Sequence, residues 1–208
     1  MVTWHWLIDM DKALFTFIHV DGAVGFLDGF MKLLRHQYTW VPLYAFLLYY
    51  IIRFGKSQVL PFIALTLLCF AITDYSSASI FKPMLARLRP CHDPDLAGEI
   101  RGLVGCGGVY SFPSSHASNH FGLATFWYFA IHRMTSRKWY WLWFWALIIC
   151  YAQIYVGKHY PLDIAAGALL GFVTGMLCFR IYDRWTIRRS GNINRPDRGR
   201  RPSLANAS

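Results

Sequence analysis

Long stretches without any Asp, Glu, Lys or Arg constrain this sequence more than any other feature. The chain is 55% hydrophobic and only 15% charged, which is too apolar for an ordinary soluble domain. A helix needs roughly 20 mostly apolar residues to cross a bilayer. Five stretches approach that length: 36–52, 57–73 with an uncharged continuation to 81, 102–131 with its helical part from about 115, 139–157 and 164–179. The sequence therefore predicts an all-α fold, a polytopic membrane helical bundle with five transmembrane helices.

The N-terminal segment has a different pattern and does not predict a sixth span. Apolar residues recur there at helical spacing, with charged and polar residues between them. The apolar positions are Leu7, Met10, Leu14 and Phe17, and the others are Asp9, Asp11, Lys12 and Thr16. We expect an amphipathic helix that lies on the membrane surface. No signal peptide is expected, because the first 20 residues lack a continuous apolar core.

The net charge of +10 suits either nucleic-acid binding or a fixed orientation in a membrane, and the apolar stretches favour the second. With five spans, one face carries 13 of the 21 Lys and Arg residues, in the 53–56 loop, the 132–138 loop and the C-terminal end. By the positive-inside rule this face is cytoplasmic. We expect a multi-pass protein of the cell membrane with no nucleic-acid partner. Residues 1–185 would form the membrane domain, and 186–208 a basic, disordered tail near anionic lipids.

The five cysteines fall into two groups. Cys69, Cys150 and Cys178 lie inside apolar stretches and are expected to be buried as small hydrophobic residues. Cys91 and Cys106 lie in a loop on the outward face, rich in Gly, Pro and charge. If that face meets an oxidising compartment, these two cysteines could form a disulfide.

Two cations end the second apolar stretch. Lys82 and Arg89 are seven residues apart, about two helical turns, so they share a helix face, and Pro90 then stops the helix. Such a pair can clamp an anion, and the planar fork of arginine suits phosphate. Long basic side chains also reach lipid headgroups at the ends of ordinary spans, so this pair by itself predicts either role.

A Pro113-Ser114-Ser115-His116 sequence opens the third helix. Ser114 can cap the helix, and the free backbone N–H groups of its first turn form an anion site. His116 could donate a proton to a leaving oxygen there, although a capped helix with an interfacial histidine would look the same. His120 makes a formal metal-binding pair with His116, but the acid expected within a zinc-protease motif is missing, so no metal is predicted.

A His–Asp pair precedes and opens the fifth span. Pro161 fits the first helical turn, with His159 just before that turn and Asp163 within it. The Asp163 carboxylate can accept a hydrogen bond from one ring nitrogen of His159, which makes the other nitrogen a better nucleophile. A purely structural His–Asp pair is the alternative. Phosphoryl transfer needs cations, backbone donors, a nucleophile and an acid, and the three clusters supply all four on one face.

In this order the three motifs resemble the type 2 phosphatidic acid phosphatase superfamily, over roughly residues 5 to 185. The resemblance implies a helical bundle with its site at the outer membrane face, a lipid phosphate substrate and no cofactor or metal. It implies that His159 attacks phosphorus to give a phosphohistidine, that Asp163 orients His159, and that His116 protonates the leaving oxygen and later activates water. Lys82, Arg89, Ser114 and Ser115 would hold the phosphate oxygens.

The sequence departs from the family pattern at one place. The third motif of the family begins Ser-Arg, six residues before the nucleophile, where this chain has Ala152 and Gln153. Gln153 can still donate a hydrogen bond to phosphate but carries no charge, and losing a charge-assisted contact costs about 1.5–3 kcal/mol. Arg87, Arg101 or Lys158 could supply the missing charge.

The substrate is less constrained than the chemistry. Residues 11–15 and 27–28 resemble the opening of bacterial undecaprenyl-diphosphate phosphatases of this family. That similarity predicts undecaprenyl diphosphate as the substrate, with phosphatidylglycerophosphate, phosphatidic acid and lipid A 1-phosphate as alternatives. A vanadium haloperoxidase would use the same anion clamp, but those enzymes are mostly soluble. A non-catalytic membrane protein with this fold is the remaining alternative, and Gln153 is its only support.

Overall fold

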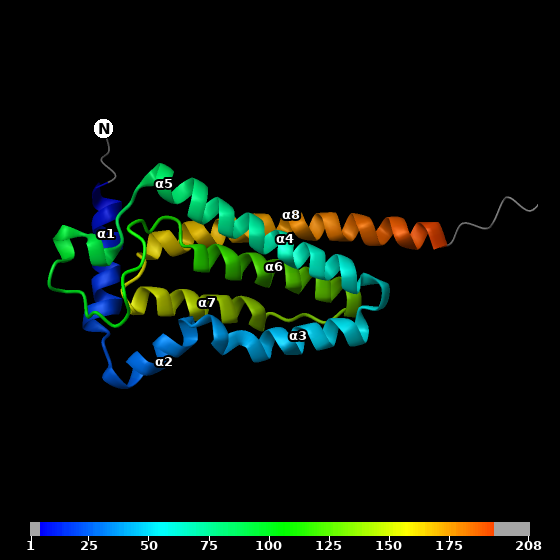
Figure 1. Cartoon of the computed structure of the whole chain (residues 1–208), viewed down its shortest axis with the longest axis horizontal. Coiled ribbons are helices and arrows are strands. Elements are labelled where there is room, and N and C mark those ends of the chain that lie inside the picture. Colours follow the sequence, from blue (N-terminus) through cyan, green and yellow to red (C-terminus); the bar gives the residue numbers. More distant parts are fainter. Residues whose placement is uncertain (1–4, 194–208) are drawn as a thin grey trace, which may run out of the picture.

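The computed structural model describes residues 5–193, and within them the chain is all-helical, without a β-strand (Figure 1). The α-helices are α1 (His5–Thr16), α2 (Gly25–Arg35), α3 (Val41–Phe54), α4 (Val59–Tyr75), α5 (Lys82–Leu85), α6 (Ser115–Thr135), α7 (Trp141–Tyr155) and α8 (Pro161–Ile193). A π-helical segment, Ser76–Phe81, joins α4 to α5, and another, Phe17–Asp21, follows α1.

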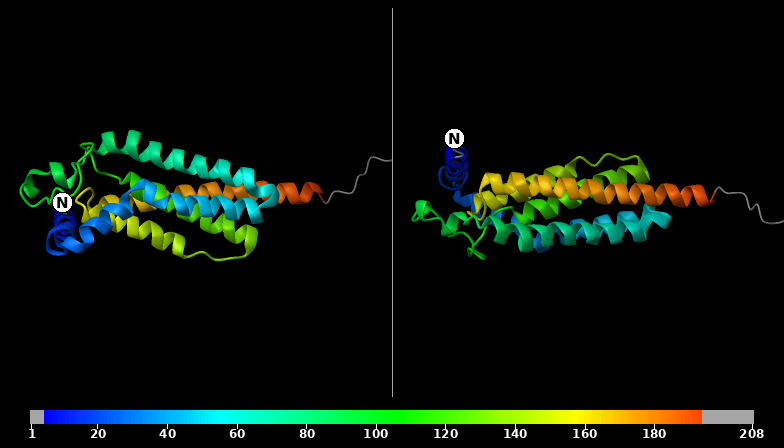
Figure 2. Two further views of the ribbon diagram at one scale, coloured as in Figure 1. Left: turned by 60° about the horizontal axis from the view of Figure 1, so that its bottom comes forward. Right: turned by 90° about the horizontal axis from the view of Figure 1, so that it is seen from above.

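The long helices α3, α4, α6, α7 and α8 run side by side along one axis, and α1 lies across one end of them (Figures 1 and 2). Helix α6 occupies the middle and packs against α4, α7 and α8. Successive long helices run in opposite directions, so the 86–114 loop, the 156–160 loop and α1 meet at the same end. The three predicted motifs therefore come together there.

A stripe of glycines brings α8 into close contact with α6. A Cβ atom added to these glycines would lie only 2.3–2.5 Å from backbone carbonyl oxygens of α6 or its cap. The glycines are Gly167, Gly171 and Gly175, and the facing carbonyls belong to Ser114, Ser118 and Gly122. Small residues at every fourth position are what lets two helix backbones approach in this way. The close approach aligns the N-termini of the two helices that carry the second and third motifs.

By length and apolar composition, two continuous helical runs can each cross a membrane: Lys56–Leu85 and Pro161–Ile187. A third is possible if His5–Asp21 and Gly25–Arg35, which are bent by 117° to each other, form one broken span. Helix α7 is apolar but shorter, and the 21-residue α6 begins with polar residues. The five-span count thus remains a prediction.

Three predicted boundaries differ from the structure. The helix predicted to run to Pro90, with Lys82 and Arg89 on one face, ends at Leu85 because Ala86 takes a left-handed conformation with φ 48°, so Arg89 lies in the loop. The first stretch becomes α-helical at Val41 and not at residue 36, because Gln37–Trp40 form a 3₁₀ turn. Helix α8 continues past residue 185 to Ile193, where a disordered tail was predicted. Helix-compatible residues follow Trp185, and the first helix-breaking proline comes only at Pro196. The rest of the predicted tail, 194–208, lies outside the described residues.

Helix α1 presents the predicted apolar face outward. Met10 and Leu14 are exposed, as is Phe17 directly after the helix, whereas Phe15 is buried against the bundle. Asp11 was predicted among the polar positions of a surface helix, and that prediction is wrong: its side chain is buried, because it bonds to the end of the bundle.

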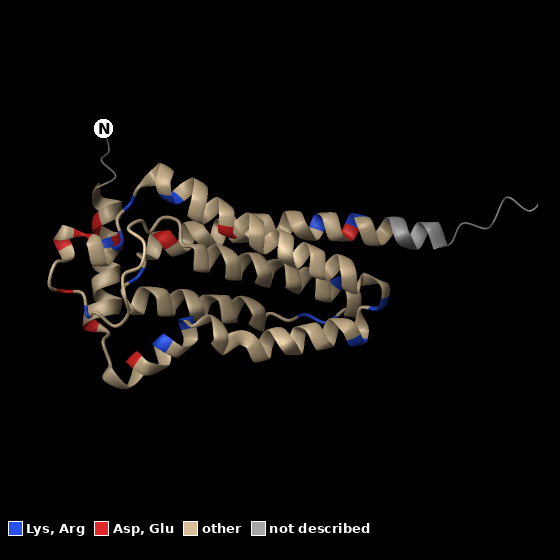
Figure 3. Cartoon of the chain, viewed as in Figure 1, with Lys and Arg blue, Asp and Glu red and all other residues tan. Residues whose placement is uncertain are grey.

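The outer surface of the bundle is apolar along its length. Large hydrophobic residues such as Leu60 on α4, Phe144 on α7 and Leu169 on α8 are more than half exposed. Lys, Arg, Asp and Glu gather mainly at the two ends, and the middle is almost free of them (Figure 3). An exposed apolar band between charged ends is the surface of a protein embedded in a lipid bilayer.

Candidate active site

The first motif reaches the second through a direct hydrogen bond. The Nζ of Lys82, at the start of α5, donates to the Oγ of Ser115 at 2.9 Å. The Oγ of Ser77 also donates to Ser115 Oγ, at 2.9 Å. Lys82 is therefore held at the N-terminus of α6, where the unpaired backbone N–H groups lie.

The second motif forms the cap of α6. Ser114 is the N-cap residue, and its Oγ accepts from the backbone N–H of Ala117. The backbone N–H of Ser114 donates to the carbonyl of Asp163 at 2.9 Å, which ties this turn to the start of α8. His116 lies in the first turn of α6, and the cations that act on it are Arg35 and Lys82.

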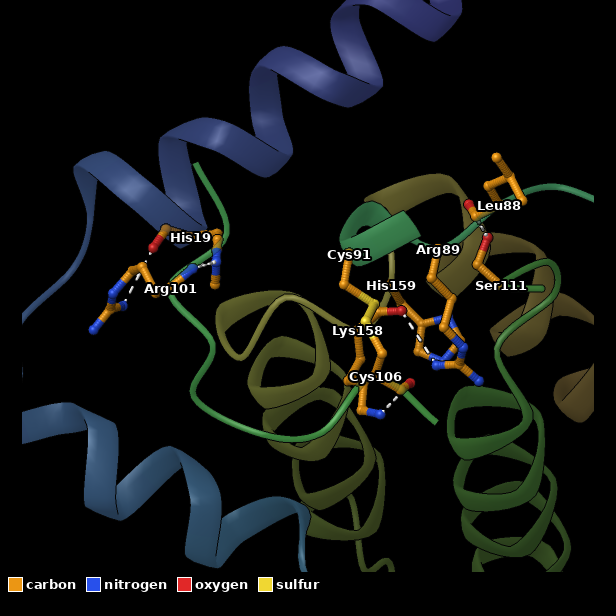
Figure 4. Close-up of a disulfide and its surroundings, with 9 residues drawn as sticks. All are labelled: His19, Leu88, Arg89, Cys91, Arg101, Cys106, Ser111, Lys158 and His159. Atoms are coloured by element: carbon orange, nitrogen blue, oxygen red, sulfur yellow. Dashed lines mark hydrogen bonds between the residues drawn. A yellow bond between two sulfur atoms is a disulfide. The ribbon is translucent and has the colours of Figure 1, made fainter. Parts of the chain in front are cut away.

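The third motif places His159 between a cation and a carboxylate. Its Nδ1 lies 3.5 Å from Oδ2 of Asp163, which is a long contact and not a well-formed hydrogen bond. Its Nε2 lies 3.5 Å from Nη1 of Arg89, which also donates to the carbonyl of Lys158 at 3.3 Å (Figure 4). Burial lowers the pKa of His159 to about 4, against the opposing effect of Asp163. The imidazole is therefore neutral near pH 7, as a nucleophile must be.

Arg87 forms a salt bridge with the Asp163 oxygen that does not face His159. The guanidinium of Arg87 donates to Asp163 Oδ1 at 2.8 Å and to Asp11 Oδ2 at 2.5 Å. Asp11 also accepts from the backbone N–H of Leu162 at 2.8 Å. Arg87 stacks on the ring of Tyr160, 4.2 Å from its centroid. Helix α1 is thus connected to the His–Asp pair, a contact that the amphipathic pattern of α1 did not predict.

Comparison with known proteins agrees with this geometry. The sequence pattern of the PAP2 superfamily matches residues 59–187, which include all three motifs. The chain belongs to the PAP2 superfamily. It is therefore a membrane-associated phosphatase that acts on lipid phosphates, as the ordered motifs predicted.

Several relatives of this PAP2 phosphatase have assigned activities. It is 34% identical to a lipid A 4'-phosphatase of Porphyromonas gingivalis, over 86% of this chain and 78% of the relative. It is 31% identical to a lipid A 4'-phosphatase of Bacteroides thetaiotaomicron (93% and 86%) and 29% identical to an undecaprenyl-diphosphatase of Sulfolobus acidocaldarius (88% and 83%). The crystal structure of Aquifex aeolicus LpxE is similar with a TM-score of 0.58 and 25% identity, covering 82% of this chain and 95% of that one.

Gln153, which stands where the family has arginine, is inside the site of this PAP2 protein. Its side chain is 1% exposed, and its Nε2 has no hydrogen-bond partner. Its Oε1 accepts from Nε of Arg35, the last residue of α2, at 3.5 Å. No sequence motif includes Arg35, because 118 residues separate the two partners.

The three cations predicted to compensate for Gln153 have other partners. Arg87 pairs with Asp11 and Asp163, as described above. Arg101 pairs with Asp28 and donates to the carbonyl of His19. Lys158 Nζ donates to the carbonyl of Cys106. The prediction that Arg87 or Arg101 would supply the missing charge is therefore wrong, since a carboxylate already neutralises each of them.

A disulfide closes the loop that follows Arg89. Cys91 and Cys106 are bonded, with their Cα atoms 6.1 Å apart, beside Lys158 and Arg89 (Figure 4). This confirms the pairing suggested by their shared loop. The remaining cysteines, Cys69, Cys150 and Cys178, are buried and free, as predicted.

Proposed function

We propose that this protein hydrolyses a phosphate monoester of lipid A through a phosphohistidine intermediate, at the end of the bundle that faces out of the cytoplasm. The observation that carries the chemistry is the environment of His159. Its Nδ1 faces a carboxylate, its Nε2 faces Arg89, and burial keeps the ring neutral. A neutral imidazole beside a cation can attack a phosphorus atom whose oxygens that cation holds.

In the first step the Nε2 lone pair of His159 attacks phosphorus, and the P–O bond to the lipid breaks. The phosphate anion bound beside His116 favours the protonated form of its ring, which gives its proton to the leaving oxygen, so the lipid departs as an alcohol. Asp163 stabilises the positive charge that develops on the His159 ring. Lys82, Arg89, the backbone N–H groups after Ser114 and the Ser115 hydroxyl would bind the phosphate oxygens, with Gln153 as a neutral donor.

In the second step the now neutral His116 takes a proton from water as that water attacks the phosphohistidine. The N–P bond breaks, inorganic phosphate leaves, and both histidines return to their starting states. The cycle uses only groups of this chain and water, with no metal or cofactor in any step.

The choice of lipid A rests on the relatives. The two lipid A 4'-phosphatases, at 34% and 31% identity, are more similar to this chain than the undecaprenyl-diphosphatase at 29%. The predicted preference for undecaprenyl diphosphate has no specific support beyond that last similarity. Lipid A is therefore the first candidate substrate. The sequence motifs allowed its 1-phosphate as an alternative, and the relatives favour hydrolysis of its 4'-phosphate.

Phosphate release by the purified protein in detergent, with EDTA present, tests the function. Lipid A, undecaprenyl diphosphate, phosphatidylglycerophosphate and phosphatidic acid would be compared side by side. We expect release from lipid A, its loss in His159→Ala, and no change in the control His5→Ala, an exposed histidine on α1. Phosphate release from undecaprenyl diphosphate alone would show that this lipid, and not lipid A, is the substrate. Full activity in His159→Ala would refute the mechanism.

For the membrane arrangement we propose that α3, the α4–α5 run, α6, α7 and α8 are five spans, with α1 on the outer surface. The basic loops 53–56 and 132–138 and the end of α8 would face the cytoplasm. Labelling of intact cells with a membrane-impermeant thiol reagent tests this. Glu99→Cys should react and Arg137→Cys should not, both positions being exposed. The reverse pattern would invert the orientation.

A further inference from the structure

We propose that Arg35, from the end of α2, is the third phosphate-binding cation of this site and replaces the charge that Gln153 lacks. The proposal rests on the phosphatase function above and deepens it by assigning a binding residue outside the three motifs. The positive charge would come from α2 and not from α7, but it would lie at the same place in the site.

The contact between Arg35 and Gln153 brings the cation beside the position where the family has arginine. Arg35 is the last residue of α2, which packs against α7, and α7 carries Gln153. Its Nε donates to Gln153 Oε1 at 3.5 Å, and the side chain is partly buried. Among residues 5–187, whose side chains the structure describes, this is the only hydrogen bond of the Arg35 side chain, and no carboxylate forms a salt bridge with it. Both terminal nitrogens of the guanidinium therefore remain available to an anion.

The charge of Arg35 acts on three separate groups of the site. Burial and then Arg89 and Arg35 lower the pKa of Lys158 to about 8. Burial lowers the pKa of Arg89, and Arg35 acts in the same direction. Arg35 is also among the charges that act on His116. These three groups come from different elements, so Arg35 is within electrostatic range of several parts of the site.

Unpaired donors in the site point to an anionic ligand at the same place. Among the described residues, the buried side-chain atoms without a partner include Arg89 Nε and Gln153 Nε2. Buried donors of this kind are normally satisfied, and a phosphate offers several strong acceptor oxygens. In the proposed site Arg89, Arg35 and the Gln153 amide all donate to one phosphate, and Gln153 orients Arg35 through its carbonyl oxygen.

A structural role for Arg35 makes a different prediction. A basic residue in the last turn of a helix also stabilises the helix dipole. Replacing Arg35 would then lower thermal stability without a specific effect on phosphate. Lys32 is an exposed cation in the last turn of the same helix and provides the matched control.

The test measures binding of inorganic phosphate to the purified full-length protein by calorimetry, together with its thermal unfolding. We expect Arg35→Gln to weaken phosphate binding by about 10- to 100-fold, as loss of a charged hydrogen-bond donor does. Lys32→Gln should bind like the wild type, and Arg35→Lys should lie between. Transfer of the charge, in Arg35→Gln with Gln153→Arg, should restore part of the affinity.

Wild-type phosphate affinity in Arg35→Gln would overturn the proposal. The proposal would also fail if Arg35→Gln with Gln153→Arg unfolds at the wild-type temperature but binds phosphate no better than Arg35→Gln. A charge at position 153 would then not replace the charge at position 35. Inorganic phosphate is the probe, so this result does not depend on which lipid is cleaved. A wild-type protein that binds phosphate but leaves lipid A intact would refute the substrate proposal alone.

Discussion

Removing the positive charge of Arg87 is the most informative perturbation of the fold around the site. Arg87 is the shared partner of two carboxylates whose side chains are almost inaccessible, Asp11 at 1% and Asp163 at 0%, while its own side chain is 23% exposed. In Arg87→Gln both carboxylates lose their cation but stay buried. An uncompensated buried charge costs about 3–5 kcal/mol, which is much more than a surface ion pair contributes.

The expected change is large enough to measure in detergent. For a chain of this size each kcal/mol shifts Tm by about 2–4 °C, so Arg87→Gln should lower Tm by roughly 6–20 °C. Thermal unfolding followed by tryptophan fluorescence is the assay, with the exposed Arg137→Gln as the charge-matched control. Adding Asp11→Asn to Arg87→Gln should recover part of the loss, because one uncompensated carboxylate is removed. A Tm for Arg87→Gln equal to that of the control would refute the reasoning.

Three further predictions concern the nucleophile, the helix contact and the disulfide. Because burial lowers the pKa of His159 to about 4, and only the neutral ring attacks, kcat/KM should fall near pH 4 as the pH decreases; a fall near 6.5 would contradict this. Gly171→Ala, which puts a Cβ 2.3 Å from a carbonyl oxygen of α6, should destabilise the protein by about 1–3 kcal/mol or more in thermal unfolding, whereas Gly29→Ala, with open space around it, should not. Replacing Cys91 and Cys106 by Ser should cost about 3 kcal/mol and abolish the mobility change on reducing gels; an unchanged Tm would count against a stabilising role.

Local chemistry explains why much of the site could be predicted. Lys82 and Arg89, Ser114 to His116, and His159 with Asp163 lie in short motifs beside helix ends, and antiparallel helices bring those ends to one face. The Ser114 cap and the Cys91–Cys106 disulfide followed from the same local reasoning.

The errors share one cause, which is that partners of buried charges are distant in sequence. Asp11 looked like a polar position on a surface helix, yet its partner Arg87 is 76 residues away. Arg87 looked like a spare cation for phosphate, but Asp11 and Asp163 neutralise it. Arg35 matches no motif, because its only sequence context is a helix end. Charge identity is visible in a sequence, while charge pairing is not.

The sequence by itself determined the helical class, the apolar surface and the reacting groups, because hydrophobicity and side-chain chemistry are local properties. Tertiary structure alone decided which cations face the phosphate site and which are held by carboxylates. That division depends on how closely α8 approaches α6 along Gly167 and Gly171, and on α1 and α2 packing over the end of the bundle. Burial then makes each pairing energetically decisive, since a charge removed from water requires a partner wherever in the chain that partner lies.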